Sequence, residues 1–160
     1  MLKEVSGDIL LTGARVIAHG VAPNDDFAQG LALQLRERYP AMVKDFRHYC
    51  HASHPKPGEV WTWAGADGVR IVNLMTQDRA PHPGAKPGKA TAHNVNLALR
   101  HLKQLIEDED FPSVALPRLA TGVGGLDWKT VRPLVDHHLG ALDVPIYLYA
   151  TYHAGQKGSE

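Results

Sequence analysis

Apolar residues along this chain form short unbroken runs that alternate with longer segments of mixed polarity. The runs contain many β-branched and aromatic side chains, which is the pattern of strands. An Asp67-Gly68 pair between two of the runs is typical of a tight hairpin turn. The predicted strands are residues 2–6, 16–21, 59–63, 69–75, 114–119 and 144–149.

The segments between the strands carry apolar residues at helical spacing. The longest has Leu99, Leu102 and Ile106 along one side and stops before Pro112. Asp127 is a suitable N-cap for the last helix, and Gly140 suits its C-terminal end. The predicted helices are residues 30–38, 42–51, 87–109 and 128–139, with Pro40 separating the first two.

Strands that alternate with helices predict a parallel sheet with helices on both faces. We therefore expect a three-layer α/β/α sandwich whose central sheet is mixed but mainly parallel. The chain of 160 residues fits a single domain over residues 1–153, followed by a flexible tail over residues 154–160. Ligands of such folds bind beyond the carboxyl ends of the strands.

The balance of positive and negative residues argues against partners that bind through the overall charge of the protein. The chain has 17 Lys plus Arg and 17 Asp plus Glu, so we expect neither general nucleic-acid binding nor a membrane partner. Any anion must be bound locally by placed donors. Cys50 is the only cysteine, which excludes an internal disulfide and favours a reducing, cytoplasmic compartment. We expect a monomer.

The strongest local motif is the turn Thr121-Gly122-Val123-Gly124-Gly125, between a predicted strand and a predicted helix. Glycines here let consecutive backbone N–H groups converge on one anion next to a helix N-terminus. The turn lacks the Lys-Ser or Lys-Thr of a P-loop and the spacing of the dinucleotide fingerprint. A plain flexible connection is the alternative reading.

Two further loops leave strands at the same predicted edge. Residues 19–30 form a long connection that ends at Gly30, and residues 76–89 combine prolines and glycines with Gln77, Asp78 and Lys86. Connections of this length are usually functional, although both can also be solvated surface loops.

A cluster of His48, Cys50, His51 and His54 contains the ligand types that zinc prefers. Its members lie within seven residues, on one predicted helix and the residues that lead from it into Pro55, and no second pair of ligands exists elsewhere, so we interpret the cluster as helix surface. We expect no metal and no cofactor.

Taken together, these segments resemble a macrodomain over roughly residues 5–149. The resemblance rests on Val5-Ser6-Gly7-Asp8-Ile9-Leu10, Ile17-Ala18-His19-Gly20, Gln29-Gly30-Leu31-Ala32 and the stretch from Leu116 to Trp128. It is greatest for the branch that includes the terminal ADP-ribose protein glycohydrolase and bacterial antitoxins that remove ADP-ribose from DNA.

The resemblance implies a role for each matching position. Asp8 would accept a hydrogen bond from the exocyclic amine of adenine, with the Ile9 amide beside it. The loop around Gly30 would approach the second ribose and the phosphates. Tyr149 would pack near the adenine. The diphosphate would be surrounded by Thr121, Gly122, Val123, Gly124 and Gly125.

The chain departs from this branch at two catalytic positions. Hydrolases of the branch carry a lysine that forms a covalent adduct with the ribose, and this chain has Gln77 there. Some use an aspartate in the glycine-rich loop, where this chain has Gly124. A glutamine amide cannot replace the lysine as nucleophile, because its nitrogen lone pair is delocalised.

We therefore expect an ADP-ribosyl hydrolase that acts on modified acidic side chains or nucleic-acid ends by attack of water. Gln77 would position the water or the ribose hydroxyls, and Asp78, His19 or a substrate phosphate would act as base. The alternative is a non-catalytic module that binds free or attached ADP-ribose. A structural or partner-binding protein with incidental loops is a third reading.

Overall fold

The computed structural model describes residues 1–160 and contains one six-stranded sheet in the order β1-β6-β5-β2-β4-β3. Every neighbouring pair is parallel except the β3–β4 hairpin, so the sheet is mixed and mainly parallel, as the sequence predicts. The strands are β1 (Leu2–Gly7), β2 (Val16–Val21), β3 (Val60–Ala64), β4 (Arg70–Met75), β5 (Val114–Pro117) and β6 (Ile146–Tyr152).

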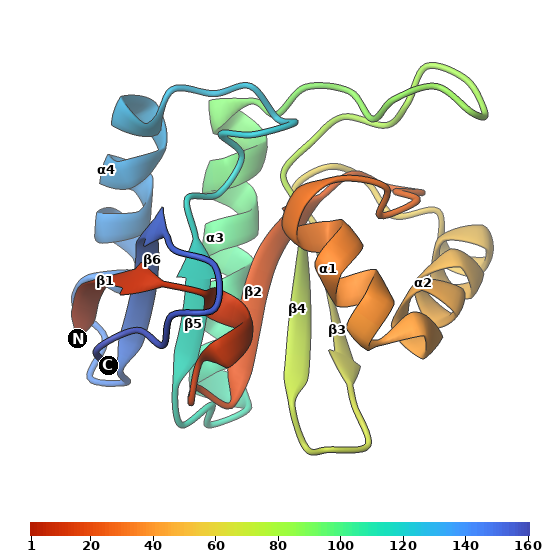
Figure 1. Cartoon of the computed structure of the whole chain (residues 1–160). Helices are drawn as coiled ribbons and strands as arrows, with labels where there is room; N and C mark the ends of the chain where they lie inside the picture. The colour runs from red at the N-terminus through yellow and green to blue at the C-terminus, as the bar shows by residue number, and fades with distance from the viewer.

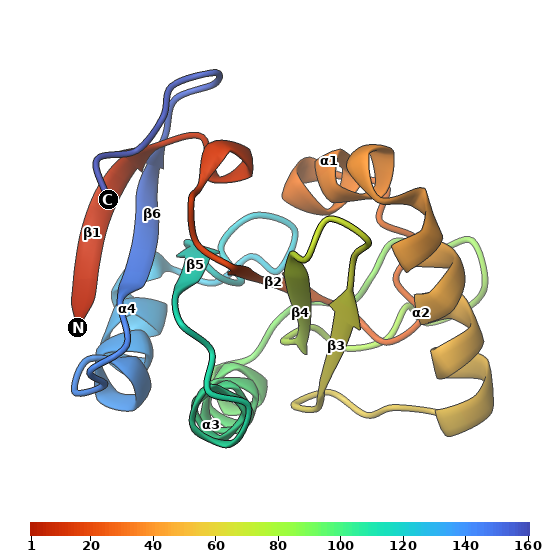
Figure 2. The same cartoon turned by 90° about the horizontal axis from the view of Figure 1, so that it is seen from below.

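Helices cover both faces of the sheet, which confirms the three-layer sandwich. Figure 2 shows α1 and α2 on one side of the strands and α3 and α4 on the other. The helices are α1 (Gly30–Arg38), α2 (Pro40–Ser53), α3 (Ala92–Asp108) and α4 (Trp128–Leu139), with a short 3-10 helix η1 (Ile9–Leu11) after β1.

Each face of the sheet has its own apolar core, because side chains alternate across a strand. On β2, Val16 and Ala18 pack with the buried residues of α3 and α4. Ile17 and Val21 pack on the opposite face with α1 and α2, around the buried Phe27 and Phe46. The unbroken apolar run of β2 is therefore buried on both sides, as its sequence predicts.

Several boundaries differ from the prediction, and each has a local cause. The helix predicted from residue 87 begins at Ala92, because Gln77 forms a bridge with Ala90 and Thr91 caps the helix. Pro40 stands in the first turn of α2, where a proline needs no N–H partner. The fifth strand ends at Pro117, since proline has no N–H to continue the ladder.

The residues predicted to form a flexible tail lie against the domain. Figure 1 shows the dark-blue segment after β6 beside the red η1. The Asp8 N–H donates to the carbonyl of Gln156 at 2.7 Å, and the Gly13 N–H donates to the Glu160 carboxylate at 3.0 Å. These contacts join residues far apart in sequence, which no local sequence pattern reveals.

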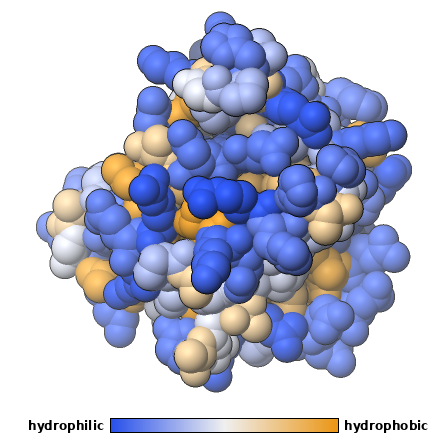
Figure 3. All heavy atoms as spheres, turned by 90° about the vertical axis from the view of Figure 1, so that its right-hand side faces the viewer, coloured by the Kyte–Doolittle hydropathy of each residue, from blue (hydrophilic) through white to orange (hydrophobic).

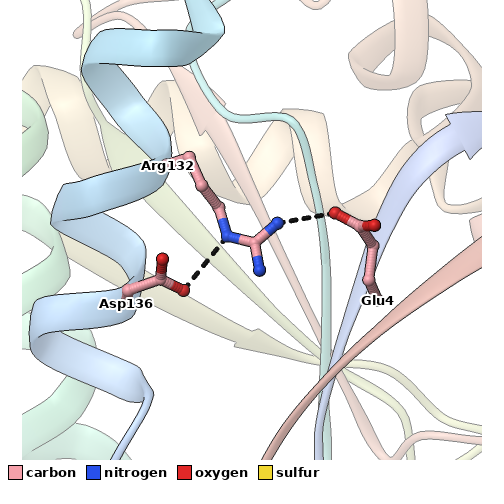
Figure 4. A network of polar contacts seen from close by, with 3 residues as sticks. All are labelled: Glu4, Arg132 and Asp136. Atoms are coloured by element: carbon pink, nitrogen blue, oxygen red, sulfur yellow. Dashed lines mark hydrogen bonds and ion pairs between the residues drawn. The ribbon is translucent and has the colours of Figure 1, made fainter.

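The surface is mainly polar on the side of the molecule seen in Figure 3. On the face drawn in Figure 3, apolar residues form separate spots among hydrophilic ones. Arg132 on α4 donates to Glu4 of β1 at 2.6 Å and to Asp136 at 3.0 Å, which links a helix to the edge strand (Figure 4). No helix combines the length and the apolar character that crossing a bilayer requires.

Candidate functional site

A cavity of about 490 Å³ opens at the carboxyl ends of the parallel strands, where the sequence predicts the ligand site. All three unusual loops contribute to its walls, along with Tyr149 and Tyr152 from β6. Figure 1 shows these loops crossing the same end of the sheet. A second hollow adjoins it, and the two share Gly30, Leu31, Pro117, Tyr149 and Tyr152.

The glycine-rich turn forms one wall and leaves its amides free. The backbone N–H groups of residues 121–124 donate to no acceptor within the chain, and all four residues line the cavity. Two other backbone hydrogen bonds hold the turn in place. The Leu126 N–H donates to the Ala120 carbonyl at 2.9 Å, and the Ala90 N–H donates to the Gly124 carbonyl at 3.0 Å. Consecutive unpaired donors at a cavity wall suit an anion with several oxygens.

Within the turn, Gly124 and Gly122 have very different surroundings. A Cβ atom on Gly124 would lie 2.6 Å from the Ala120 carbonyl oxygen and 2.9 Å from the Cβ of Ala90, so no side chain fits. A Cβ on Gly122 would meet nothing within 4 Å. The close packing at Gly124 sets the course of the turn, and Gly122 faces open space.

The N-terminus of α1 adds a second group of donors. Gly30 opens the helix with a φ of 61°, and the N–H groups of residues 30–32 have no acceptor in the chain. The preceding loop is fixed by Asp25, whose carboxylate accepts from the N–H groups of Ala22 and Phe27, each at 2.9 Å. Burial raises the pKa of this carboxyl. A helix N-terminus and the amides of the glycine-rich turn therefore border one cavity.

Gln77 lies in the same cavity with a fixed amide. It is 5% exposed, and its Nε2 donates to the carbonyl of Gly88 at 3.0 Å. That bond leaves Oε1 as an acceptor with no partner in the chain. The side chain can therefore accept a hydrogen bond from a water molecule or a hydroxyl.

The structure separates the other two candidate catalytic residues. Asp78 is exposed, accepts from Nδ2 of Asn94 on α3 at 3.1 Å, and does not line the cavity. His19 does line it and is 2% exposed. Its Nε2 lies 2.7 Å from Oδ1 of Asn73 on the neighbouring strand.

The hydrogen bonds of Asn73 define the protonation of His19. Asn73 Nδ2 donates to the Trp61 carbonyl at 3.3 Å, so its Oδ1 faces His19 and can only accept. The His19 Nε2 therefore carries the proton and Nδ1 has a free lone pair. Burial lowers the pKa of His19 to about 4, so the ring is neutral at pH 7.

The residues that resemblance assigns to adenine lie beside the second hollow. Ile9 and Tyr149 line it with Gly7 and Tyr152, whereas Asp8 sits behind them and is 8% exposed. Asp8 caps η1 by accepting from the Leu10 N–H at 3.1 Å. Apolar and aromatic walls next to a carboxylate suit a flat base with an amino group.

Two cations of the cavity, Lys86 and Arg118, have no specific role predicted from the sequence. Lys86 belongs to the Pro- and Gly-rich loop, and Arg118 stacks over the Trp128 ring with 5.5 Å between its Cζ and the ring centroid. Pro117 was the available signal, because it ends β5 before Arg118, which the sequence placed inside the predicted strand 114–119. Elsewhere, Cys50 is buried in α2 while His48, His51 and His54 are exposed.

These features define an α/β domain with a cavity at the carboxyl edge of its sheet, bordered by backbone N–H groups that have no acceptor in the chain. A model of the Macro domain family matches residues 19–135, and the chain belongs to this family. The macrodomain resemblance found in the sequence is confirmed.

Known relatives are glycohydrolases. The chain is 29% identical to the DNA ADP-ribosyl glycohydrolase of Mycobacterium tuberculosis over 137 residues, which cover 82% of this chain and 37% of that protein. It is 23% identical to the human ADP-ribose glycohydrolase OARD1, covering 83% and 80% of the two chains. The macrodomain of Thermus aquaticus DarG superimposes with a TM-score of 0.80 at 25% identity, covering 94% and 98%.

The chain spans about two fifths of the length of the DNA ADP-ribosyl glycohydrolases that it matches. It corresponds to nearly the whole of the separate DarG macrodomain.

Proposed function

We propose that this macrodomain is an ADP-ribosyl hydrolase that removes ADP-ribose from modified acidic side chains or nucleic-acid ends. The observation that carries the proposal is the pair of donor groups, residues 30–32 and 121–124, with unpaired N–H groups at the wall of one cavity. A diphosphate supplies the oxygens that such donors bind. The glycohydrolase activity of the relatives supports the same ligand.

In this proposal Asp8 and the Ile9 amide bind the adenine edge and Tyr149 packs near the base. Gly30 and its loop approach the second ribose and the phosphates. The amides of the glycine-rich turn, residues 121–125, surround the diphosphate. The two adjoining hollows, which share Tyr149 and Gly30, support an extended ligand with a base at one end.

Gln77 positions the attacking water through its free Oε1. The water oxygen forms a bond to C1″ of the ribose, and the bond from C1″ to the oxygen of the modified group breaks. The water proton passes to a base, and the released carboxylate or phosphate leaves as an anion. His19 is favoured over Asp78 as a base within the chain because it lines the cavity, and a substrate phosphate is the alternative.

The test measures ADP-ribose release from mono-ADP-ribosylated protein and DNA by wild type, Gln77→Ala and Asp78→Ala. We expect Gln77→Ala to lose at least about tenfold in rate, since positioned polar groups contribute factors of this size or larger. Asp78→Ala is the matched control and is expected to stay within about threefold. Equal rates for wild type and Gln77→Ala would remove Gln77 from the mechanism.

A second candidate function is a non-catalytic module that binds ADP-ribose. Gln77 favours it, because the resemblance implies a nucleophilic lysine at this position and an amide cannot form the covalent adduct. Calorimetric binding of ADP-ribose without release from any modified substrate would establish this function and contradict the hydrolase.

We also propose that the protein acts as a monomer in the cytoplasm. The buried, free thiol of Cys50 supports a reducing compartment, and it cannot link two copies of the chain by a disulfide. A molar mass of about 17.5 kDa by light scattering for this chain would agree, and a doubled mass would not.

A further inference from the structure

The segment after β6, residues 153–160, makes an unusual set of contacts with residues of the proposed adenine end. It turns back at once, with the Gln156 N–H donating to the His153 carbonyl at 3.2 Å. The His153 N–H then donates to the Gly7 carbonyl at 3.1 Å. The turn therefore lies directly beside the end of β1.

Asp8 is held by this segment through both its backbone and its carboxylate. Its N–H donates to the Gln156 carbonyl at 2.7 Å, and its Oδ2 accepts from the Gly155 N–H at 3.0 Å. Oδ1 is already bound to the Leu10 N–H. Each carboxylate oxygen has two lone pairs, so these bonds fix the orientation of Asp8 and leave acceptor capacity for a ligand.

Tyr149 is held by the same segment through its hydroxyl group. Its hydroxyl donates to the carboxylate of Glu160, which also accepts from the Thr12 hydroxyl and the Gly13 N–H. Burial and the hydrogen bond to Glu160 raise the pKa of Tyr149 to about 12, so the phenol keeps its proton and remains a donor. Glu160 therefore connects Tyr149 to the loop that follows η1.

Close packing leaves no room for a side chain where the segment meets β1 and β6. A Cβ on Gly158 would lie 2.9 Å from Cε2 and the hydroxyl oxygen of Tyr149. A Cβ on Gly7 would lie 2.8 Å from the Gly158 nitrogen. Gly7 and Gly158 meet here, so the backbone of the segment packs directly against the end of β1 and the Tyr149 ring. It lines neither hollow, so it supports the wall from behind.

We propose that residues 153–160 set the base specificity of this site, with Glu160 as a positioning residue that acts through Tyr149 and Asp8. The inference rests on the proposed function, because it assigns those two residues to the adenine of the ligand. Glu160 itself does not contact the ligand. It holds the segment in place, and the segment in turn fixes the carboxylate that reads the exocyclic amine.

The experiment compares two ligands by calorimetry: ADP-ribose and inosine diphosphate ribose, in which a carbonyl replaces the exocyclic amine. Wild type should prefer ADP-ribose by at least about tenfold, since the carbonyl cannot donate to Asp8. Glu160→Ala should weaken ADP-ribose binding about fivefold or more and reduce the preference accordingly. Glu160→Gln, which keeps an acceptor for the Tyr149 hydroxyl, should stay within about twofold of wild type.

Glu107→Ala on α3 is the matched control, because Glu107 is exposed and its side chain has no hydrogen bond or ion pair. Thermal melts confirm that each variant is folded at the temperature of the titration. A variant that is folded but merely less stable would keep the ratio of the two affinities. An unchanged ratio in Glu160→Ala, with wild type binding and discriminating, would overturn this inference alone. Absence of ADP-ribose binding by wild type would overturn the proposed function itself.

Discussion

At the scale of single residues, the site depends on backbone groups more than on side chains. Gly124 is needed because the turn brings the Ala120 carbonyl and the Ala90 methyl against it. Gly122 has open space around it and contributes an N–H group to the cavity wall. The two glycines therefore give different experimental information. A side chain on Gly124 would disturb the turn itself. A side chain on Gly122 would leave the turn intact and can therefore show whether a ligand lies beside it.

We predict that Gly122→Glu weakens ADP-ribose binding at least about tenfold without unfolding the protein. The new carboxylate would stand beside the diphosphate, and like charges repel strongly at short range. Gly122→Gln is the control for size, because it adds nearly the same volume without charge. Calorimetry at low and high salt provides the measurement. Equal affinities for the two variants would argue against a diphosphate at this turn.

At the scale of elements, helix ends decide how the loops meet the sheet. Thr91 caps α3 by accepting from the Asn94 N–H at 3.1 Å, and this cap follows the bridge between Gln77 and Ala90. Asp127 caps α4 by accepting from the Lys129 N–H at 3.0 Å, as its sequence position predicts. Each cap fixes the point at which a cavity loop ends.

We predict that Asp127→Ala lowers the free energy of unfolding by about 1 kcal/mol, the usual effect of removing an N-cap. Asp127→Asn should retain most of the stability, since asparagine caps helices about as well. Urea denaturation at neutral pH measures both. A loss in Asp127→Asn equal to that in Asp127→Ala would show that charge, and not the cap hydrogen bond, stabilises this helix end.

At the scale of the whole molecule, stability and the site are coupled through the buried polar pair of His19 and Asn73. The pair lies between β2 and β4 in the middle of the sheet, with His19 against the cavity. Burial lowers the folded pKa of His19 to about 4, from 6.5 when exposed. Between pH 4 and pH 6.5, His19 is therefore mostly protonated in the unfolded chain and mostly neutral in the folded chain.

Because the unfolded state binds this proton more tightly than the folded state, acid favours unfolding. The stability contributed by neutral His19 is fully present above pH 6.5 and is lost as pH falls toward about 4. We predict that the free energy of unfolding drops by roughly 2 kcal/mol more between pH 7 and pH 5 in wild type than in His19→Gln. Urea titrations at the two pH values test this. Parallel pH dependence in both proteins would show that His19 is accessible to protons in the folded state.

The order of elements, the two-sided burial of β2 and the N-cap at Asp127 were determined by the sequence, because each depends on local spacing or on one residue type. The glycine-rich turn was also recognisable, since glycine permits a backbone that other residues avoid. The amides of residues 30–32 and 121–124 border one cavity because β2 and β5, the strands that precede them, lie parallel and adjacent in the sheet.

Only the tertiary structure separated Asp78 from Gln77, because neighbours on an extended backbone point to opposite sides and the partner of Asp78 is Asn94, sixteen residues away. Only the tertiary structure brought residues 153–160 to Asp8 and Tyr149. Sequence patterns report local preference. Contacts such as that between Gly13 and Glu160 depend on the path of the whole chain.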